Sequence, residues 1–118
     1  MGFENRKLIY ASKVSGDTVR NSAGQSIGHI EDIAIDSITG DIAYAVLSLG
    51  GFLGIGERFH PVPWSVLKYE PDQNSYLVTL SNDELKAAPM YSKSTFAELR
   101  DSAENFPHNM FAYYGIYT

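Results

Sequence analysis

Histidine, serine and carboxylate side chains are the groups in this 118-residue chain that could catalyse a reaction or hold a metal ion. The three histidines are His29, His60 and His108, and His29 lies close to the acidic pair Glu31 and Asp32. Alternate side chains of a regular strand point to opposite faces, which puts Asp32 on the face opposite His29. No two histidines have the spacing of a zinc-binding helix. We therefore predict surface or structural histidines and no bound metal.

A nucleophile is equally hard to find. The chain has no cysteine, which excludes a disulfide framework, a cysteine-ligated metal and a cysteine nucleophile. Its many serines stand at turns and helix caps, where a hydroxyl bonds the local backbone. The carboxylates Glu31, Asp32 and Asp36 are typical of a strand's solvated face or turn-forming ends. We predict that the protein is not an enzyme and needs no cofactor.

A glycine-rich segment, residues 50–56, is the remaining candidate site. Phosphate-binding loops space their glycines differently and lead into a helix, whereas Glu57 and then two prolines follow here. The segment therefore predicts a wide hairpin loop shaped by four glycines, Gly50, Gly51, Gly54 and Gly56. Its large apolar residues either fold over the mouth of the domain or form a contact patch: Phe52, Leu53 and Ile55.

The charge of the chain excludes one class of partner. Nine lysines and arginines stand against 14 aspartates and glutamates, a formal charge of −5, and only Arg6 and Lys7 are adjacent. Direct binding of nucleic acid would need clustered cations. The polar N-terminus lacks the apolar run of a signal peptide, and the uncharged stretch 42–56 is too short to cross a bilayer. We expect a cytoplasmic protein without membrane insertion.

Short strands separated by turns must position these residues. In the run 27–36, Ile27, Ile33 and Ile35 share one parity and Ile30 the other, which indicates a bulge or a strong bend. Residues 37–40 supply a hairpin loop in which Gly40 can take a positive φ. The following strand, 41–49, is apolar on both parities and is predicted to be central and covered on both faces.

The rest of the predicted sheet contains an unusual proline pair. Pro61 and Pro63 both lack an N–H on the same side of an extended chain, which is typical of an edge strand. Further strands are predicted around 66–69 and 76–80, with no helix between the strands. This pattern predicts a mainly β fold, a small and strongly bent antiparallel β-barrel.

Helical signals appear only after the strands. Capping boxes at Ser81–Glu84 and Thr95–Glu98 predict two short C-terminal helices, ended by Pro89 and Pro107. The tail 105–118 has no charged residue, so its aromatic side chains should pack on the chain's own barrel or on a second copy. These aromatic residues are Phe106, Phe111, Tyr113, Tyr114 and Tyr117.

Four segments in consistent order resemble the PRC-barrel domain, and the resemblance covers about residues 8–89. They are residues 24–40, with Gly-Gln-Ser-Ile-Gly-His-Ile-Glu-Asp-Ile at their start, residues 44–56, Val62–Trp64 and Leu85–Pro89. The resemblance implies a bent β-barrel that acts as an adaptor and carries no general catalytic motif. The family includes the cytoplasmic part of the photosynthetic reaction-centre H subunit and the C-terminal half of the ribosome-maturation factor RimM.

We therefore predict a PRC-barrel domain at 1–89, with a C-terminal helix and aromatic tail extension at 90–118. The predicted function is a non-catalytic interaction and assembly module that binds a protein of unknown identity and self-associates through its tail. One alternative is a ligand-binding barrel, whose Phe52–Ile55 loop gates a pocket lined by Tyr44, His60 and Trp64. Another is an accessory factor for reaction-centre or ribosome assembly, and a third is an enzyme using His29 or His60 with a carboxylate.

Overall fold

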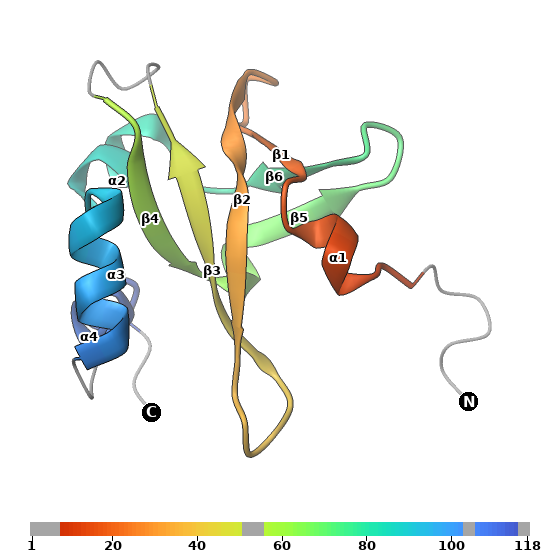
Figure 1. Cartoon of the computed structure of the whole chain (residues 1–118). Helices are drawn as coiled ribbons and strands as arrows, with labels where there is room; N and C mark the ends of the chain where they lie inside the picture. The colour runs from red at the N-terminus through yellow and green to blue at the C-terminus, as the bar shows by residue number, and fades with distance from the viewer. Residues whose placement is uncertain (1–7, 51–55, 103–105, 116–118) are drawn as a thin grey trace.

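A strongly curled sheet with the C-terminal helices along one side makes up the computed structural model, which describes residues 8–50, 56–102 and 106–115 (Figure 1). The elements in chain order are α1 (Ala11–Val14), β1 (Thr18–Arg20), β2 (Ser26–Ile35), β3 (Ile42–Leu49), β4 (Arg58–Pro63), the 3₁₀ helix η1 (Trp64–Val66), β5 (Leu67–Glu70), β6 (Ser75–Val78), α2 (Asn82–Ala87), α3 (Lys93–Ser102) and α4 (His108–Tyr113). No helix within the described ranges is long and apolar enough to span a bilayer.

The six strands form one sheet in the order β4-β3-β2-β1-β6-β5. Every neighbouring pair is antiparallel except β1 and β6, which run parallel. The prediction of a mainly β, strongly bent barrel fold is confirmed, although one neighbouring pair, β1 and β6, is parallel instead of antiparallel. Strands β4 and β5 remain as two edges, so the described sheet is a curled half-barrel. The parallel pair brings together strands more than 50 residues apart, and turn signals between neighbouring strands do not report such a pairing.

Two bulges in β2 allow one strand to follow the bend of the sheet. The β1 register passes from Gly28 to Ser26, and the β3 register passes from Ile30 to Asp32, so one residue is left out at each place. As a result Ile27 and Ile30, which have opposite parity, are both buried in the same core cluster. The predicted bulge is confirmed. The hairpin turn that follows β2 also contains Gly40 at φ 83°, as expected.

Strand β3 is buried continuously from Tyr44 to Leu49 because each of its faces packs on a different cluster. Ala45, Leu47 and Leu49 belong to the inner core of the half-barrel, together with side chains from β1, β2, β4, β6 and α2. Tyr44 and Val46 belong to an outer core that also contains Phe59, Phe96 and Met110. The prediction that this strand is central and covered on both faces is confirmed.

The proline pair lies on the free side of edge strand β4. Phe59 directs its backbone N–H and C=O away from β3, where both groups bond Tyr91 at 2.8 and 2.9 Å. Pro61 and Pro63 have the same parity as Phe59, so their nitrogens face that same outer side. A missing N–H there removes no bond to β3, which explains how two prolines fit within one strand.

The helices differ from the prediction in two places. Helix α1 lies between the N-terminus and β1, although no helix is predicted before the strands, and its single turn is too short to show a period. Helix α3 begins at Lys93, because the hydroxyl of Ser92 accepts a bond from the N–H of Thr95 at 3.2 Å. The predicted cap at Thr95 is therefore wrong. The capping box at Ser81 is present, with both of its hydrogen bonds.

Part of the aromatic tail lies against the chain's own sheet. Helix α4 packs beside β4 and α3 (Figure 1), and its Met110 is completely buried in the outer core. Phe111 lies edge-on to Tyr44, with 6.2 Å between ring centroids, and Phe106 lies edge-on to Phe96 at 5.3 Å. The sequence left open whether the tail packs on the chain's own barrel or on a second copy. These contacts are with the chain's own barrel.

We predict that Met110→Ala lowers the free energy of unfolding by about 2–5 kcal/mol, because it leaves a cavity where the tail meets the sheet. Chemical denaturation followed by fluorescence measures the change. Ala112→Gly, an exposed position on the same helix, should cost about 1 kcal/mol. Equal effects of the two variants would show that the tail does not pack on the sheet.

Gly28 is required by the close approach of β2 to β3. A methyl group at Gly28 would lie only 1.9 Å from the carbonyl oxygen of Ser48, which is a backbone atom that cannot move alone. We predict that Gly28→Ala lowers the free energy of unfolding by about 2 kcal/mol or more. Gly56→Ala is the control, since its nearest neighbour is the end of the Arg58 side chain at 3.4 Å. Similar thermal midpoints for both variants would contradict this reason.

Candidate functional site

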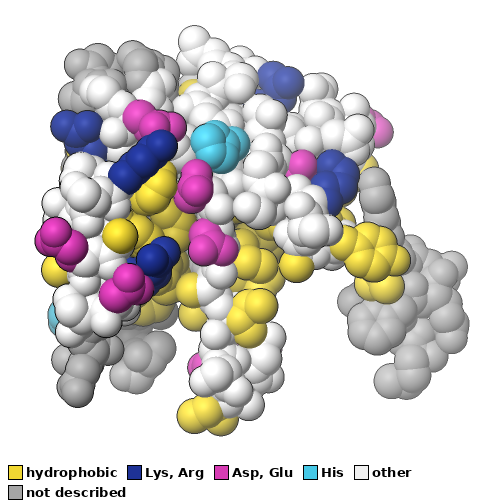
Figure 2. Space-filling view, in the orientation of Figure 1, with side chains coloured by type: hydrophobic (Ala, Val, Ile, Leu, Met, Phe, Trp, Pro, Cys, Tyr) yellow, Lys and Arg dark blue, Asp and Glu magenta, His cyan; other side chains and the backbone are white. Residues whose placement is uncertain are grey.

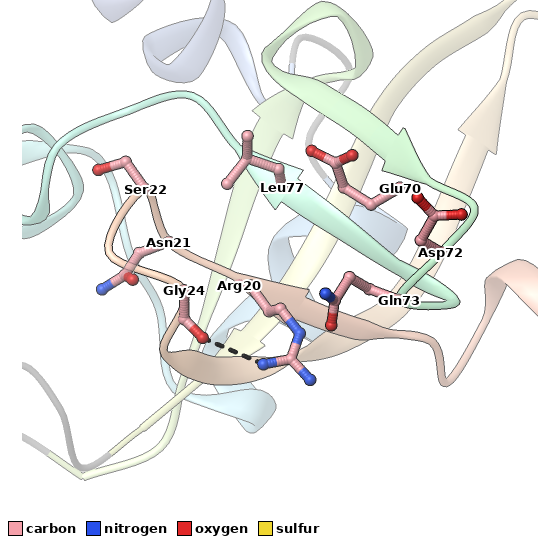
Figure 3. Close-up of a pocket in the computed structure, with 8 residues that line it drawn as sticks. All are labelled: Arg20, Asn21, Ser22, Gly24, Glu70, Asp72, Gln73 and Leu77. Carbon is pink, nitrogen blue, oxygen red and sulfur yellow. Dashed lines mark hydrogen bonds between the residues drawn. The ribbon is translucent and has the colours of Figure 1, made fainter.

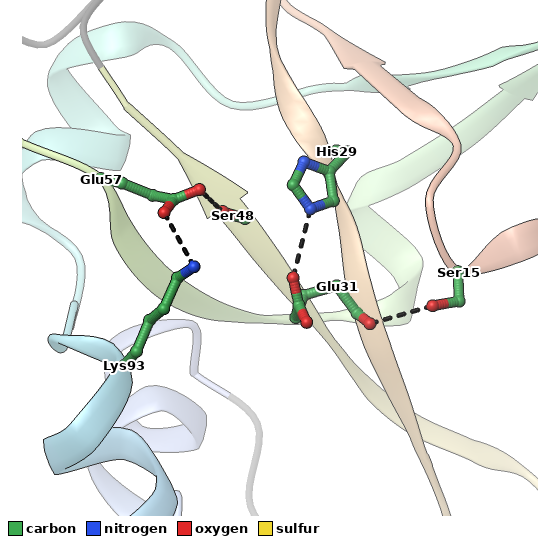
Figure 4. Close-up of polar contacts among 6 residues, drawn as sticks. All are labelled: Ser15, His29, Glu31, Ser48, Glu57 and Lys93. Atoms are coloured by element: carbon green, nitrogen blue, oxygen red, sulfur yellow. Dashed lines mark hydrogen bonds and ion pairs between the residues drawn. The ribbon is translucent and has the colours of Figure 1, made fainter.

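A polar network joins the two ends of the glycine-rich loop to helix α3 (Figure 4). Ser48 on β3 donates to Glu57 Oε2 at 2.6 Å, and Glu57 Oε1 lies 3.1 Å from Lys93 Nζ on α3. The hydroxyl of Ser48 and the ammonium of Lys93 lower the pKa of Glu57 below its usual range. Gly50 permits this arrangement, because a Cβ there would lie 3.0 Å from the Cα of Glu57. The network fixes the base of the loop.

A histidine and a carboxylate lie on the same side of the sheet as this network. His29 Nε2 is 3.2 Å from Glu31 Oε1, and the strand register places His29 beside Ser48 (Figure 4). Serine, histidine and glutamate are the residues of a hydrolase triad, but the Ser48 hydroxyl donates to Glu57. Ser48 is also almost completely buried, so a substrate cannot reach it. The geometry gives these residues no catalytic arrangement.

One serine pattern escapes the sequence prediction: Gly24, Ser26 and Gly28 fit the spacing G-x-S-x-G. In hydrolases this serine lies on a sharp turn between a strand and a helix. Here the turn joins two antiparallel strands, and Ser26 is the exposed first residue of β2. The pattern therefore shapes a hairpin and does not form a nucleophile elbow.

His60 lies inside the inner face of the sheet. It pairs with Leu47 across β4 and β3, it is completely buried, and neither ring nitrogen has a hydrogen-bond partner among the described residues. This burial lowers the pKa of His60 from 6.5 to about 4, because it penalises the charged ring. A neutral, unpartnered imidazole is a structural group rather than a surface ligand.

The structure does not assemble the predicted ligand pocket of Tyr44, His60 and Trp64. Tyr44 packs in the outer core, whereas Trp64 packs against the inner core and lies 5.7 Å from the ring of Tyr76. The sheet itself separates the two side chains. The gating residues Phe52, Leu53 and Ile55, with Gly51 and Gly54, lie outside the described residues. Within the described part of the chain, no group of three possible metal ligands occurs.

The predicted tail residues are only partly free to meet a partner. Phe106, Phe111 and Tyr114 pack against the outer core, while Tyr113 is 42% exposed and donates to the carbonyl of Glu84 at 2.9 Å. His108 is exposed, and Tyr117 lies outside the described residues. Within its described residues, 106–115, the tail therefore presents little free aromatic surface.

An apolar groove of about 230 Å³ lies where β2, β3 and α3 meet. Figure 2 shows this apolar surface between side chains of both charges. Asp32 from β2 and Arg100 from α3 are its charged residues, and the others are Ile33, Ala34, Tyr44, Val46 and Phe96. Beyond it, the β2–β3 hairpin carries two large apolar side chains in water: Ile35 is 57% exposed and Ile38 is 92% exposed. The sequence alone does not indicate this groove, because it does not show which face of the sheet α3 covers.

This curled half-barrel with short helices is the architecture of a small β-barrel domain. The family model of the PRC-barrel domain matches residues 6–85, which is more than half of the chain, so the protein belongs to this family. The resemblance drawn from the sequence motifs is thereby confirmed. No curated protein matches the chain.

We predict that His60→Leu raises the free energy of unfolding by about 1–2 kcal/mol at pH 7, because it removes two buried polar atoms without partners. The folded-state pKa of His60 is depressed, so the unfolded chain binds more protons between pH 6.5 and about 4. The native protein therefore loses stability as the pH falls through this range. The loss from this group is about 3 kcal/mol at most.

Urea denaturation of both proteins between pH 7.5 and 4 isolates the His60 contribution, since all other groups are shared. The gap between His60→Leu and the native chain should widen as the pH falls. His29→Leu is the matched control, because His29 is partly exposed and has Glu31 as its partner. A constant gap for His60→Leu would show that the buried ring is not the source.

Proposed function

We propose that the protein is a non-catalytic interaction module that associates with a second copy of itself through the β2–β3 hairpin and the adjoining groove. The observation that carries this proposal is the exposure of Ile35 and Ile38 on a hairpin that projects beyond the rest of the sheet (Figure 1). Contacts centred on apolar side chains are the usual source of binding energy between proteins. The family supports an adaptor role, and its members are generally non-catalytic.

The turn holds Ile38 outward. Asp36 Oδ1 accepts bonds from the N–H groups of Ile38 at 2.8 Å and Thr39 at 3.2 Å. These bonds favour the charged carboxylate and lower the pKa of Asp36 below its usual range. An apolar side chain fixed in this way loses little conformational entropy when it is buried by a partner.

The hairpin and the groove complement each other. Both lie on β2 and β3, so a two-fold axis near these strands would place each hairpin in the groove of the other copy. Asp32 of one copy could then pair with Arg100 of the other, while the apolar floor receives Ile35 and Ile38. Such a contact also brings two chains of charge −5 together at a locally balanced surface.

Light scattering after size exclusion, from about 10 µM to about 500 µM, tests the proposal. The native chain should reach the mass of a dimer, and Ile35→Ser combined with Ile38→Ser should stay at the mass of one chain. Leu8→Ser with Tyr10→Ser removes two other exposed apolar groups and should leave the dimer intact. A native mass of one chain at every concentration would contradict self-association.

Two predictions, the process that the protein serves and its compartment, rest on the sequence and its family resemblance and not on the geometry of the site. Reaction-centre or ribosome assembly as the process served, and the cytoplasm as the compartment, remain predictions. A pull-down from the native host with the folded chain, compared with the double serine variant, would identify a second protein that uses the same hairpin.

A further inference from the structure

A second cavity, of about 380 Å³, lies away from the hairpin and its groove (Figure 3). It is formed where the end of β1 and the turn after it face the β5–β6 hairpin. Arg20 is on one side, and Glu70, Asp72 and Gln73 are on the other. Neither the family nor the proposed self-association assigns a role to these residues.

The turn after β1 holds the arginine in place. Arg20 Nη1 donates to the carbonyl of Gly24 at 3.0 Å (Figure 3). Buried Asn21 fixes this turn, because its Oδ1 accepts from the N–H groups of Ala23 and Gln25 at 3.1 and 2.9 Å. The guanidinium is therefore anchored at Nη1, while Nη2 has no hydrogen bond in the described part of the chain and can be used by a ligand.

The free donors of Arg20 differ in their access to the cavity. Its Nε is buried and has no hydrogen bond among the described residues, whereas its Nη2 also has none there and is not buried. The register places Arg20 opposite Leu77, so both side chains lie on one face of the sheet, and both line the cavity. No described carboxylate forms an ion pair with Arg20. A carboxylate that enters the cavity would pair with the accessible Nη2.

The opposite wall of the cavity is acidic and is complementary to a positively charged group. Glu70 and Asp72 line the cavity, and neither has an ion-pair partner in the described ranges. One guanidinium and two carboxylates give the lining a formal charge of −1. Phosphates and other polyanions are repelled by such a wall, whereas a molecule with one carboxylate and two ammonium groups is complementary to it.

We propose that this cavity binds a small basic amino acid, with L-lysine as the simplest example. Its carboxylate accepts from the Nη2–H of Arg20, its ammonium groups lie against Glu70 and Asp72, and its methylene chain contacts Leu77. Because the site uses neither the hairpin nor the groove, it is independent of self-association.

Titration of the full-length chain with L-lysine, up to about 20 mM at low salt, tests the proposal by calorimetry and by amide NMR shifts. Saturable binding with shifts at Gly24, Gln73 and Leu77 is expected. Acetate, which has only the carboxylate, and cadaverine, which has only the ammonium groups, should each bind at least about tenfold more weakly.

Variants separate this site from general attraction of cations to an acidic protein. Arg20→Gln should weaken L-lysine binding at least about tenfold, and so should Glu70→Gln combined with Asp72→Asn. Asp72 is exposed and Glu70 is half-buried, so this pair tests the site even if Arg20→Gln does not fold. Arg58→Gln is the matched control, because Arg58 bonds only the carbonyl of Glu57 among its described contacts, and it should bind as the native chain does.

Three results would overturn the proposal. One is the absence of saturable L-lysine binding to the folded chain. Another is cadaverine binding as tightly as L-lysine, which would mean that the carboxylates alone attract cations. The third is unchanged affinity in the paired Glu70 and Asp72 variant.

Discussion

Strand β3 is buried on both faces, and each face needs a different part of the chain to cover it. The inner face is covered by the curl of the sheet, which depends on the bulges of β2 and on the contact of Gly28 with β3. The outer face is covered by α3 and α4, which follow the matched family region in sequence. A barrel of this kind without its C-terminal extension would expose Tyr44, Val46 and Phe59. The extension is therefore part of the same folding unit as the sheet.

This arrangement also determines which surface is left for a partner. Most of the described aromatic residues of the tail pack against the outer core of the same chain. Helix α3 covers the outer face only in part, and the groove beside Phe96 and the hairpin beyond it stay accessible. Exposed apolar area at the hairpin is thus a consequence of how far α3 reaches along β3. The proposed interaction surface and the stability of the fold share the residues Tyr44 and Val46.

Local patterns explain which features could be predicted from the sequence. The parity change in β2, the positive φ of Gly40 and the edge position of Pro61 and Pro63 each follow from residues that are neighbours in the chain. The parallel pairing of β1 with β6 could not be predicted this way, because it depends on the closing curl of the whole sheet.

The same limit applies to the candidate sites. His29 and Glu31 are two residues apart, and their proximity is visible in the sequence. The Ser48–Glu57–Lys93 network joins three segments of the chain and the Arg20 cavity joins two distant ones, so no spacing indicates them. The predicted grouping of Tyr44 with Trp64 fails for a related reason: their strand positions do not reveal that the sheet passes between them.

Polar atoms without partners have different meanings at His60 and at Arg20. His60 is completely buried, and its two ring nitrogens have no partner among the described residues, so they cost stability. Arg20 lines an open cavity of about 380 Å³, and its Nη2 is not buried and has no hydrogen bond in the described part of the chain. An accessible donor next to such a space can be satisfied by a molecule that enters it, whereas one in a packed core cannot. The distinction is therefore one of access, and it separates a structural defect of the core from the proposed binding site on the surface.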